Sequence, residues 1–204
     1  MRYWSLVLAV GFDLALCGTA PAADPRHPDW PCNQVKVPEL SVAAVWAGPS
    51  IDEIGSAWTE DPAIRDLVAR LAARRTPLDD ARTALAEFIA GTPPERRHKA
   101  ALLFAGLFTT LNNERGEVMR GIERYTRRQQ EFAEQVRSLI SQLHELQDKP
   151  DRDQSRIDEL ATKVEWQTRI FEDRRRTIGF VCEVPVLIEQ RLFALARAIQ
   201  EAIE

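Results

Sequence analysis

The sequence predicts an all-α fold, in which a helical bundle carries a long antiparallel coiled-coil hairpin and an extended N-terminal strap. Composition is the first observation, because glycine is scarce while Ala, Leu, Arg, Glu and Gln are abundant, and this mixture favours helix. The second is a pair of segments whose core-type residues recur at alternating spacings of four and three, typical of coiled coils. The third is the polar turn around Pro150 that separates them, which predicts that the two helices fold back on each other.

The two heptad runs define a register that can be checked by position. The first run is Phe104, Phe108, Leu111, Arg115, Val118, Ile122, Tyr125, Gln129, Phe132, Val136, Leu139, Leu143 and Leu146. The second is Ile157, Leu160, Val164, Gln167, Phe171, Arg174 and Ile178. Pairing Leu146 with Ile157 makes the numbers of facing residues sum to 303 and places Phe132 opposite Phe171. Gln129 then faces Arg174 as a polar layer, and we expect the hairpin to cover the seam by itself.

Residues 1–22 have the features of a cleaved signal peptide. A basic start precedes the mostly apolar residues 5–18, and an A-x-A pattern predicts cleavage after Ala22. A lipoprotein signal ending at Cys17 is the less favoured alternative, because Leu16 is bulky where a small residue is expected. We therefore expect a periplasmic or secreted protein with no membrane span after signal cleavage.

Two cysteines remain after such cleavage, and an even pair in an exported protein predicts a disulfide between Cys32 and Cys182. A redox-active or metal-binding pair is disfavoured because no C-x-x-C spacing is present. His27 and Asp29 lie near Cys32, but three such residues among prolines do not make the closed ligand set of a metal site. The sequence thus predicts no metal and no cofactor.

Residues 23–49, the strap, are rich in proline and contain little helical periodicity. Proline restricts the preceding residue and lacks an N–H group, so an extended path along the helical body is expected. Trp30 is expected to anchor the strap by burying its ring beside the disulfide. The alternative is that Trp30 is presented to a partner.

Residues 50–117 are expected to form the helical body. Ser50 and Glu53 have capping-box spacing, and Asp61-Pro62 and Thr76-Pro77 resemble helix starts. These signals predict helices near 50–58, 61–74 and 77–90. A further helix from near Pro93 to about Lys149 begins in the body, where its residues are apolar all round.

Residues 118–178 are expected to form the arm, which projects because only the seam of this part is apolar. Gly116 and Gly121 lie where the buried base becomes the arm, so a bend is expected there. Residues 179–204 are assigned to a separate C-terminal helix that begins after Val184-Pro185 and packs on the body.

The charges of the chain argue against a nucleic-acid partner and indicate one basic surface patch. The net charge of −4 gives no reason to expect nucleic acid as a partner. Arg174, Arg175 and Arg176 form the most concentrated basic cluster, which could bind an acidic partner or anionic lipid. A structural role in ion pairs with Glu172 and Asp173 is favoured over partner binding.

The sequence contains no phosphate-binding loop, catalytic triad motif or metalloprotease motif, and no enzyme is predicted. The leading interpretation is an exported cell-envelope interaction, adaptor or chaperone-like protein with a protein partner. The alternative is a periplasmic small-ligand or metal-binding accessory component of an oxidoreductase or transport system, with a pocket near Trp30, Trp46 and Trp58. A homo-oligomer through the arm is left as an open alternative.

Overall fold

The computed structural model describes residues 25–91 and 95–204, and within these ranges the predicted all-α fold is confirmed. The elements in order are α1 (Val42–Val45), a 3-10 helix η1 (Ala57–Thr59), α2 (Pro62–Ala72), α3 (Leu78–Ala90), α4 (Arg96–Gln147) and α5 (Gln154–Ile203). The predicted signal peptide, its cleavage after Ala22, and Cys17 lie outside the described residues. The strap is described from residue 25 onward, and outside α1 it consists of irregular chain with turns and bends.

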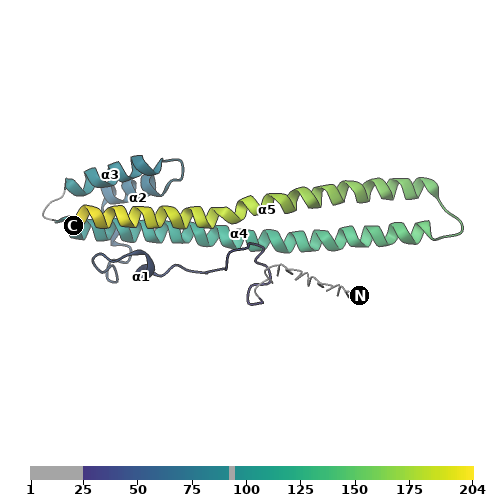
Figure 1. The fold of residues 1–204 in the computed structure, drawn as a ribbon, viewed down its shortest axis with the longest axis horizontal. Helices are drawn as coiled ribbons and strands as arrows, with labels where there is room; N and C mark the ends of the chain where they lie inside the picture. The colour runs from purple at the N-terminus through teal and green to yellow at the C-terminus, as the bar shows by residue number, and fades with distance from the viewer. Residues whose placement is uncertain (1–24, 92–94) are drawn as a thin grey trace, which may run out of the picture.

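The long antiparallel hairpin consists of α4, with 52 residues, and α5, with 50, which lie side by side along the molecule (Figure 1). Asp153 caps the start of α5, because its side chain accepts a hydrogen bond from the Arg156 N–H. Phe132 and Phe171, the predicted partners, have ring centroids 6.5 Å apart. The predicted register of the hairpin is therefore confirmed at this layer.

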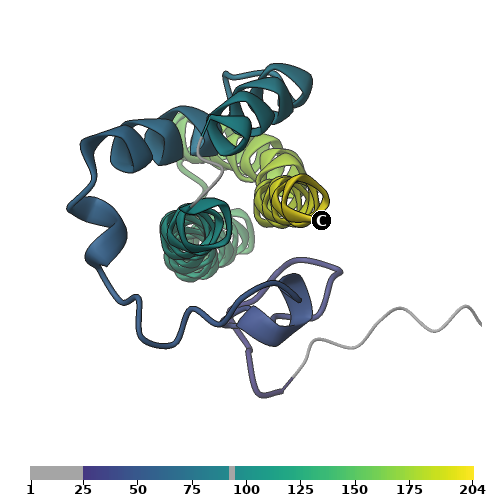
Figure 2. The same cartoon turned by 90° about the vertical axis from the view of Figure 1, so that its left-hand side faces the viewer.

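The base of the hairpin is enclosed by two groups of elements, with α2 and α3 on one side and α1 with the strap on the other (Figure 2). Trp46 stacks on Phe104 of α4, with centroids 4.2 Å apart and rings inclined by 7°. The other members of the core are apolar residues of α2 to α5, among them Ile64, Val68, Leu71, Leu85, Ile89, Leu103, Leu107, Ile188, Leu192, Leu195 and Ile199. This burial holds the near half of the hairpin, while the far half projects as predicted (Figure 1).

The expected separate C-terminal helix is wrong, because α5 runs without a break through Pro185 to Ile203. Proline removes one backbone hydrogen bond and bends the helix, and Figure 1 shows α5 bending part-way along. The strap contacts α5 close to this proline, since Gln34 Nε2 donates to the Cys182 carbonyl at 2.6 Å. The boundary between the arm and residues 179–204 is thus a bend within one helix.

The capping box predicted at Ser50 does not form. The Ser50 hydroxyl accepts from the Asp52 N–H at 3.2 Å and donates to the Asp52 carboxylate, so residues 50–56 form turns before η1. Gly55 has a φ of 51°, a left-handed conformation that a continuous helix does not contain. The predicted cap at Asp61 is confirmed, because its side chain accepts from the N–H groups of Ala63 and Ile64.

Alanine substitutions at two glycines of α4 should have opposite effects on the stability of the protein. A Cβ on Gly106 would lie 2.7 Å from Val68 Cγ2 and 2.9 Å from the Trp58 ring, whereas Gly121 has its nearest contact at 3.8 Å. Gly106→Ala should therefore lower the free energy of unfolding by about 1–3 kcal/mol through overpacking. Gly121→Ala should raise it by about 0.5–1 kcal/mol through helix propensity. Urea denaturation of both variants tests this, and two changes of the same sign would contradict it.

Candidate functional site

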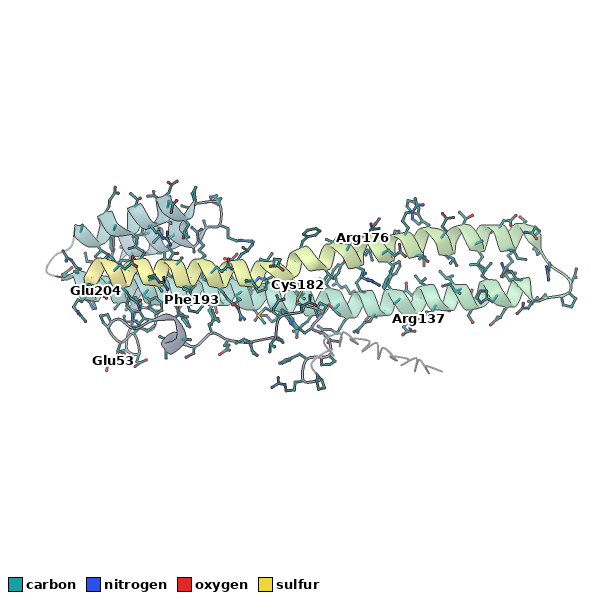
Figure 3. All side chains as sticks on the ribbon, viewed as in Figure 1. Glu53, Arg137, Arg176, Cys182, Phe193 and Glu204 are labelled. Carbon is teal, nitrogen blue, oxygen red and sulfur yellow. A yellow bond between two sulfur atoms is a disulfide. The ribbon has the colours of Figure 1, made fainter. Side chains whose placement is uncertain are left out.

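The strap crosses the hairpin where α5 bends, and a disulfide joins them there. Cys32 and Cys182 are bonded with an S–S distance of 1.99 Å and Cα atoms 5.6 Å apart, in the predicted pairing. Figure 3 labels Cys182 beside this bend. The disulfide therefore joins the N-terminal part of the described chain to the middle of α5.

Trp30 lies next to the disulfide and is 7% exposed. Its ring packs in a small cluster with Met119 and Ile122 of α4, and its Nε1 donates to the Gln34 carbonyl at 2.8 Å. The chain's own residues thus cover the indole. This position fits the role of an anchor for the strap and leaves little of the ring for a partner.

A buried ion pair lies beneath the strap and was not anticipated from the sequence. Arg115 is 3% exposed, and its Nε donates to Glu189 Oε1 of α5 at 2.5 Å. Its Nη1 also donates to the Pro38 carbonyl of the strap at 3.3 Å. The sequence does place Arg115 in the heptad seam. Because the numbers of facing residues sum to 303, residue 188, the neighbour of Glu189, lies opposite Arg115.

Two further ion pairs link the strap to α4. Lys36 Nζ lies 2.5 Å from Glu123 Oε1, and Arg127 Nη1 lies 2.9 Å from Asp29 Oδ2. The disulfide and these side chains hold the strap at several points along α4. The arrangement is structural, because the charged groups are satisfied by one another rather than aimed at an open cavity.

Among the described residues, Arg191 of the body has a shifted pKa. Burial lowers the pKa of Arg191 in α5, and the charge of Glu114 acts in the opposite direction. Arg191 Nε donates to the Leu71 carbonyl at the end of α2 at 2.7 Å. The side chain thus joins two helices, which is a packing role rather than a catalytic one.

The predicted basic cluster is exposed on the arm, and its three members have different surroundings. The Arg174 guanidinium lies 5.1 Å from the centroid of the Phe132 ring, so the expected buried layer with Gln129 is wrong. Arg176 pairs with Asp173 at 2.9 Å, as the ion-pair interpretation expected. Arg175 lines a groove between the two helices.

The seam of the arm is less completely covered than the sequence suggested. Val136 and Ile157 are buried, but Tyr125, Phe132 and Phe171 are only half-buried. At the base of the hairpin α2 and α3 add a further layer, whereas the arm has only two helices to cover the same side chains. Apolar surface therefore remains accessible along the arm.

The outer side of α5 carries a row of exposed apolar side chains, the α5 stripe, made of Trp166, Phe180 and Leu187. Their exposed fractions are 62%, 79% and 53%. The spacings of fourteen and seven residues are multiples of a heptad, and Asp173 occupies the heptad position between Trp166 and Phe180. Over this span an α-helix keeps the three within an arc of about 60°. Sequence reasoning missed this stripe because the principal seam accounted for the heptad pattern.

A groove of about 310 Å³, the arm groove, lies between α4 and α5 next to the strap. Its apolar lining comes from Pro31, Tyr125, Ala133, Phe171 and Ile178, and its cations are Arg137 and Arg175. Three neutral polar residues, Thr126, Gln129 and Gln130, complete the lining. Figure 3 labels Arg137 and Arg176 on the two helices of this part of the arm. The groove combines an apolar floor with positive charge, which suits an amphipathic anion.

The three tryptophans expected near a common pocket do not line one. Trp30 packs under the strap with Met119, whereas Trp46 stacks on Phe104 and Trp58 packs against the main core. Their rings fill separate places in the packing. A cavity of about 130 Å³ does lie beneath the strap beside Trp30, as predicted, but Trp46 and Trp58 do not line it. The arm groove, at about 310 Å³, is the larger candidate.

Two of the three residues His27, Asp29 and Cys32, where a metal site is disfavoured by the sequence, have other partners. Cys32 is in the disulfide and Asp29 pairs with Arg127. Over residues 25–91 and 95–204, no group of three or more His, Cys, Asp or Glu side chains has the arrangement needed to hold a metal ion. In the same ranges, no helix has the length and apolar character to cross a membrane.

Comparison with known proteins found no relative. The chain matches no protein family, no curated protein and no solved structure. Function must therefore be argued from the chemistry of the surfaces described above.

Proposed function

We propose that this chain is an exported interaction protein of the cell envelope, with an adaptor or chaperone-like role, and that its arm binds a protein partner. The α5 stripe is the observation that carries the proposal. Trp166 and Phe180 lie largely in solvent although each could gain by burial. A partner helix with apolar residues at heptad spacing is the occupant that matches their arrangement.

The surroundings of the α5 stripe support a protein partner with acidic residues. Arg169 and Arg176 flank the stripe and form exposed pairs with Glu165 and Asp173. Such surface pairs contribute little to stability, so the arginines can be engaged by a partner at small loss. Aromatic and arginine side chains together are also the residue types enriched at binding interfaces.

Export is the second part of the proposal. The signal-like residues 1–22 are typical of secreted proteins. The disulfide between Cys32 and Cys182 fits an oxidising compartment such as the periplasm. A rigid arm held by a disulfide-tied strap suits a protein that presents a surface outside the cytoplasm.

Site-specific crosslinking in the source cells tests the partner surface. A photoreactive side chain at position 166 or 180 should give a crosslinked product with another protein, because these positions lie in the α5 stripe. The same group at position 131, which is also exposed but lies on α4, serves as the matched control. The products are measured by electrophoresis and mass spectrometry of the tagged chain.

Three outcomes are informative in this experiment. A distinct product from positions 166 and 180 but not 131 supports the proposal. Equal products from all three positions, or none, would contradict a partner surface on α5. A product made of two copies of this chain would replace the protein partner with a homo-oligomer.

The arm groove favours a second candidate function, that of a periplasmic small-ligand accessory component of an oxidoreductase or transport system. Its volume of about 310 Å³ lies at the lower end of the range of ligand pockets. It lies on the seam side of the arm, whereas the α5 stripe lies on the outer side of α5. Both functions can therefore be tested separately on the same protein.

A further inference from the structure

The arm groove exists because three features meet at one place. Phe171 packs on Phe132 with ring centroids 6.5 Å apart and lines the groove, and Tyr125 and Ile178 continue this lining. The strap adds Pro31 from a third direction. Seam side chains here are half-buried because the arm has no third helix. The result is a recess with an aromatic and aliphatic floor rather than a filled core layer.

The floor of the groove favours an acyl chain. Tyr125, Phe171 and Ile178 present flat and branched apolar surface that a methylene chain can cover along the direction of the helices. The Tyr125 hydroxyl is already engaged, since it donates to the Arg174 carbonyl at 3.2 Å. The phenol therefore contributes mainly its ring to the groove, and the ligand needs few polar atoms along its length.

The cations of the groove favour an anionic head group. Arg137 and Arg175 come from opposite helices, and no acidic side chain lines the groove. Arg137 also pairs with Glu134, but both side chains are well exposed, so this pair is weak. No ion pair to Arg175 occurs among the described residues. A guanidinium binds a carboxylate through two parallel hydrogen bonds, which makes Arg175 the principal candidate for the head group.

We propose that the arm groove binds a long-chain fatty acid anion, with the acyl chain on the floor and the carboxylate on Arg175. A single chain suits a recess of about 310 Å³ better than the two chains of a phospholipid. This inference deepens the small-ligand candidate function and is independent of the partner surface on α5. Its test uses purified protein without a partner, so failure of either proposal is distinguishable from failure of the other.

Isothermal titration calorimetry of the disulfide-bonded chain with laurate, below the concentration at which micelles form, tests the proposal. Laurate should bind at one site per chain, and dodecanol should bind at least tenfold more weakly because it lacks the charge. Each additional methylene from decanoate to laurate should tighten binding about two- to fourfold, as expected for an apolar floor. The comparison of laurate with dodecanol tests the charged head group, and the comparison of decanoate with laurate tests the acyl chain.

Substitutions locate the ligand within the groove. Arg175→Gln should weaken laurate binding at least tenfold, whereas Arg169→Gln should leave it unchanged, because Arg169 is exposed on the same helix but does not line the groove. Ala133→Phe should also weaken binding by filling the floor. Circular dichroism establishes that the variants retain their helix content.

The outcomes that would overturn the proposal are specific. Equal binding of laurate and dodecanol would remove the role of the arginines, and binding unaffected by both Arg175→Gln and Ala133→Phe would place the ligand elsewhere. Binding to phosphatidylglycerol vesicles or to an acidic amphipathic peptide, without binding of laurate, would replace the fatty acid with a membrane or a protein segment.

Discussion

Replacing Cys32 and Cys182 with serine is expected to lower the free energy of unfolding by up to about 5 kcal/mol. The bond closes a loop with a sequence separation of 150 residues. On the chain-entropy model, removing a crosslink over a loop of this length raises the conformational entropy of the unfolded chain. This lowers the free energy of unfolding by about 5 kcal/mol. Guanidinium denaturation of the oxidised protein and of the Cys32→Ser/Cys182→Ser variant measures the difference. Equal transition midpoints and slopes would contradict the prediction.

Hydrogen exchange separates the effect of the disulfide on the unfolded chain from its effect on the strap. Without the bond, only noncovalent contacts hold the strap, such as those of Trp30 with Met119 and of Lys36 with Glu123. We therefore expect residues 25–41 to exchange faster in the variant while the base of α4 and α5 retains local protection. The reduced wild-type protein is the matched control and should behave like the variant. Faster exchange throughout the hairpin would show that the disulfide supports the whole fold.

The architecture was predictable where local pattern and packing agree. The heptad runs specify both which faces of α4 and α5 meet and the register, because a shift of one residue would remove Phe132 from Phe171. Asp61 also behaves as predicted, since a side chain that caps its own backbone needs no distant partner. These features depend on residues close in sequence or on a repeated period.

The structure departs from the sequence interpretation where tertiary contacts outweigh a local signal. The sequence predicts a helix start near Pro185, yet burial of Ile188 and Leu192 on the same face keeps α5 continuous. At Ser50 the capping pattern is present, but Gly55 turns the chain and Asp52 occupies the hydroxyl. A short stretch of sequence shows the capping residues, but it does not show the tertiary contacts that decide whether the segment forms a helix there.

The candidate sites were the least predictable part. Arg174–Arg176 were recognised as a cluster, but only the fold shows that Arg175 alone lines the groove. The α5 stripe also needs the hairpin register, because exposure of Trp166 and Phe180 follows from which face of α5 meets α4. A heptad pattern identifies the faces that could be apolar, and the partner helix decides which one is covered.

Removal of the Arg115–Glu189 ion pair is the second substitution expected to lower the free energy of unfolding substantially. Arg115→Leu should lower the free energy of unfolding by about 1–3 kcal/mol, because it leaves the half-buried Glu189 without its cation under the strap. The matched control is Arg127→Leu, which removes an exposed pair with Asp29 from the same helix and should change stability by less than about 1 kcal/mol. Urea denaturation of the two variants gives the comparison directly.

A double-mutant cycle identifies the origin of that loss. Glu189→Leu alone leaves Arg115 buried with the Pro38 carbonyl as its hydrogen-bond acceptor. This substitution should therefore also be destabilising. The double variant Arg115→Leu/Glu189→Leu removes both charges and should recover most of the loss, because apolar side chains suit this layer of the seam. The cycle should therefore give a coupling energy of about 1–3 kcal/mol. Additive losses would mean that Arg115 stabilises the hairpin through its contact with the strap rather than through Glu189.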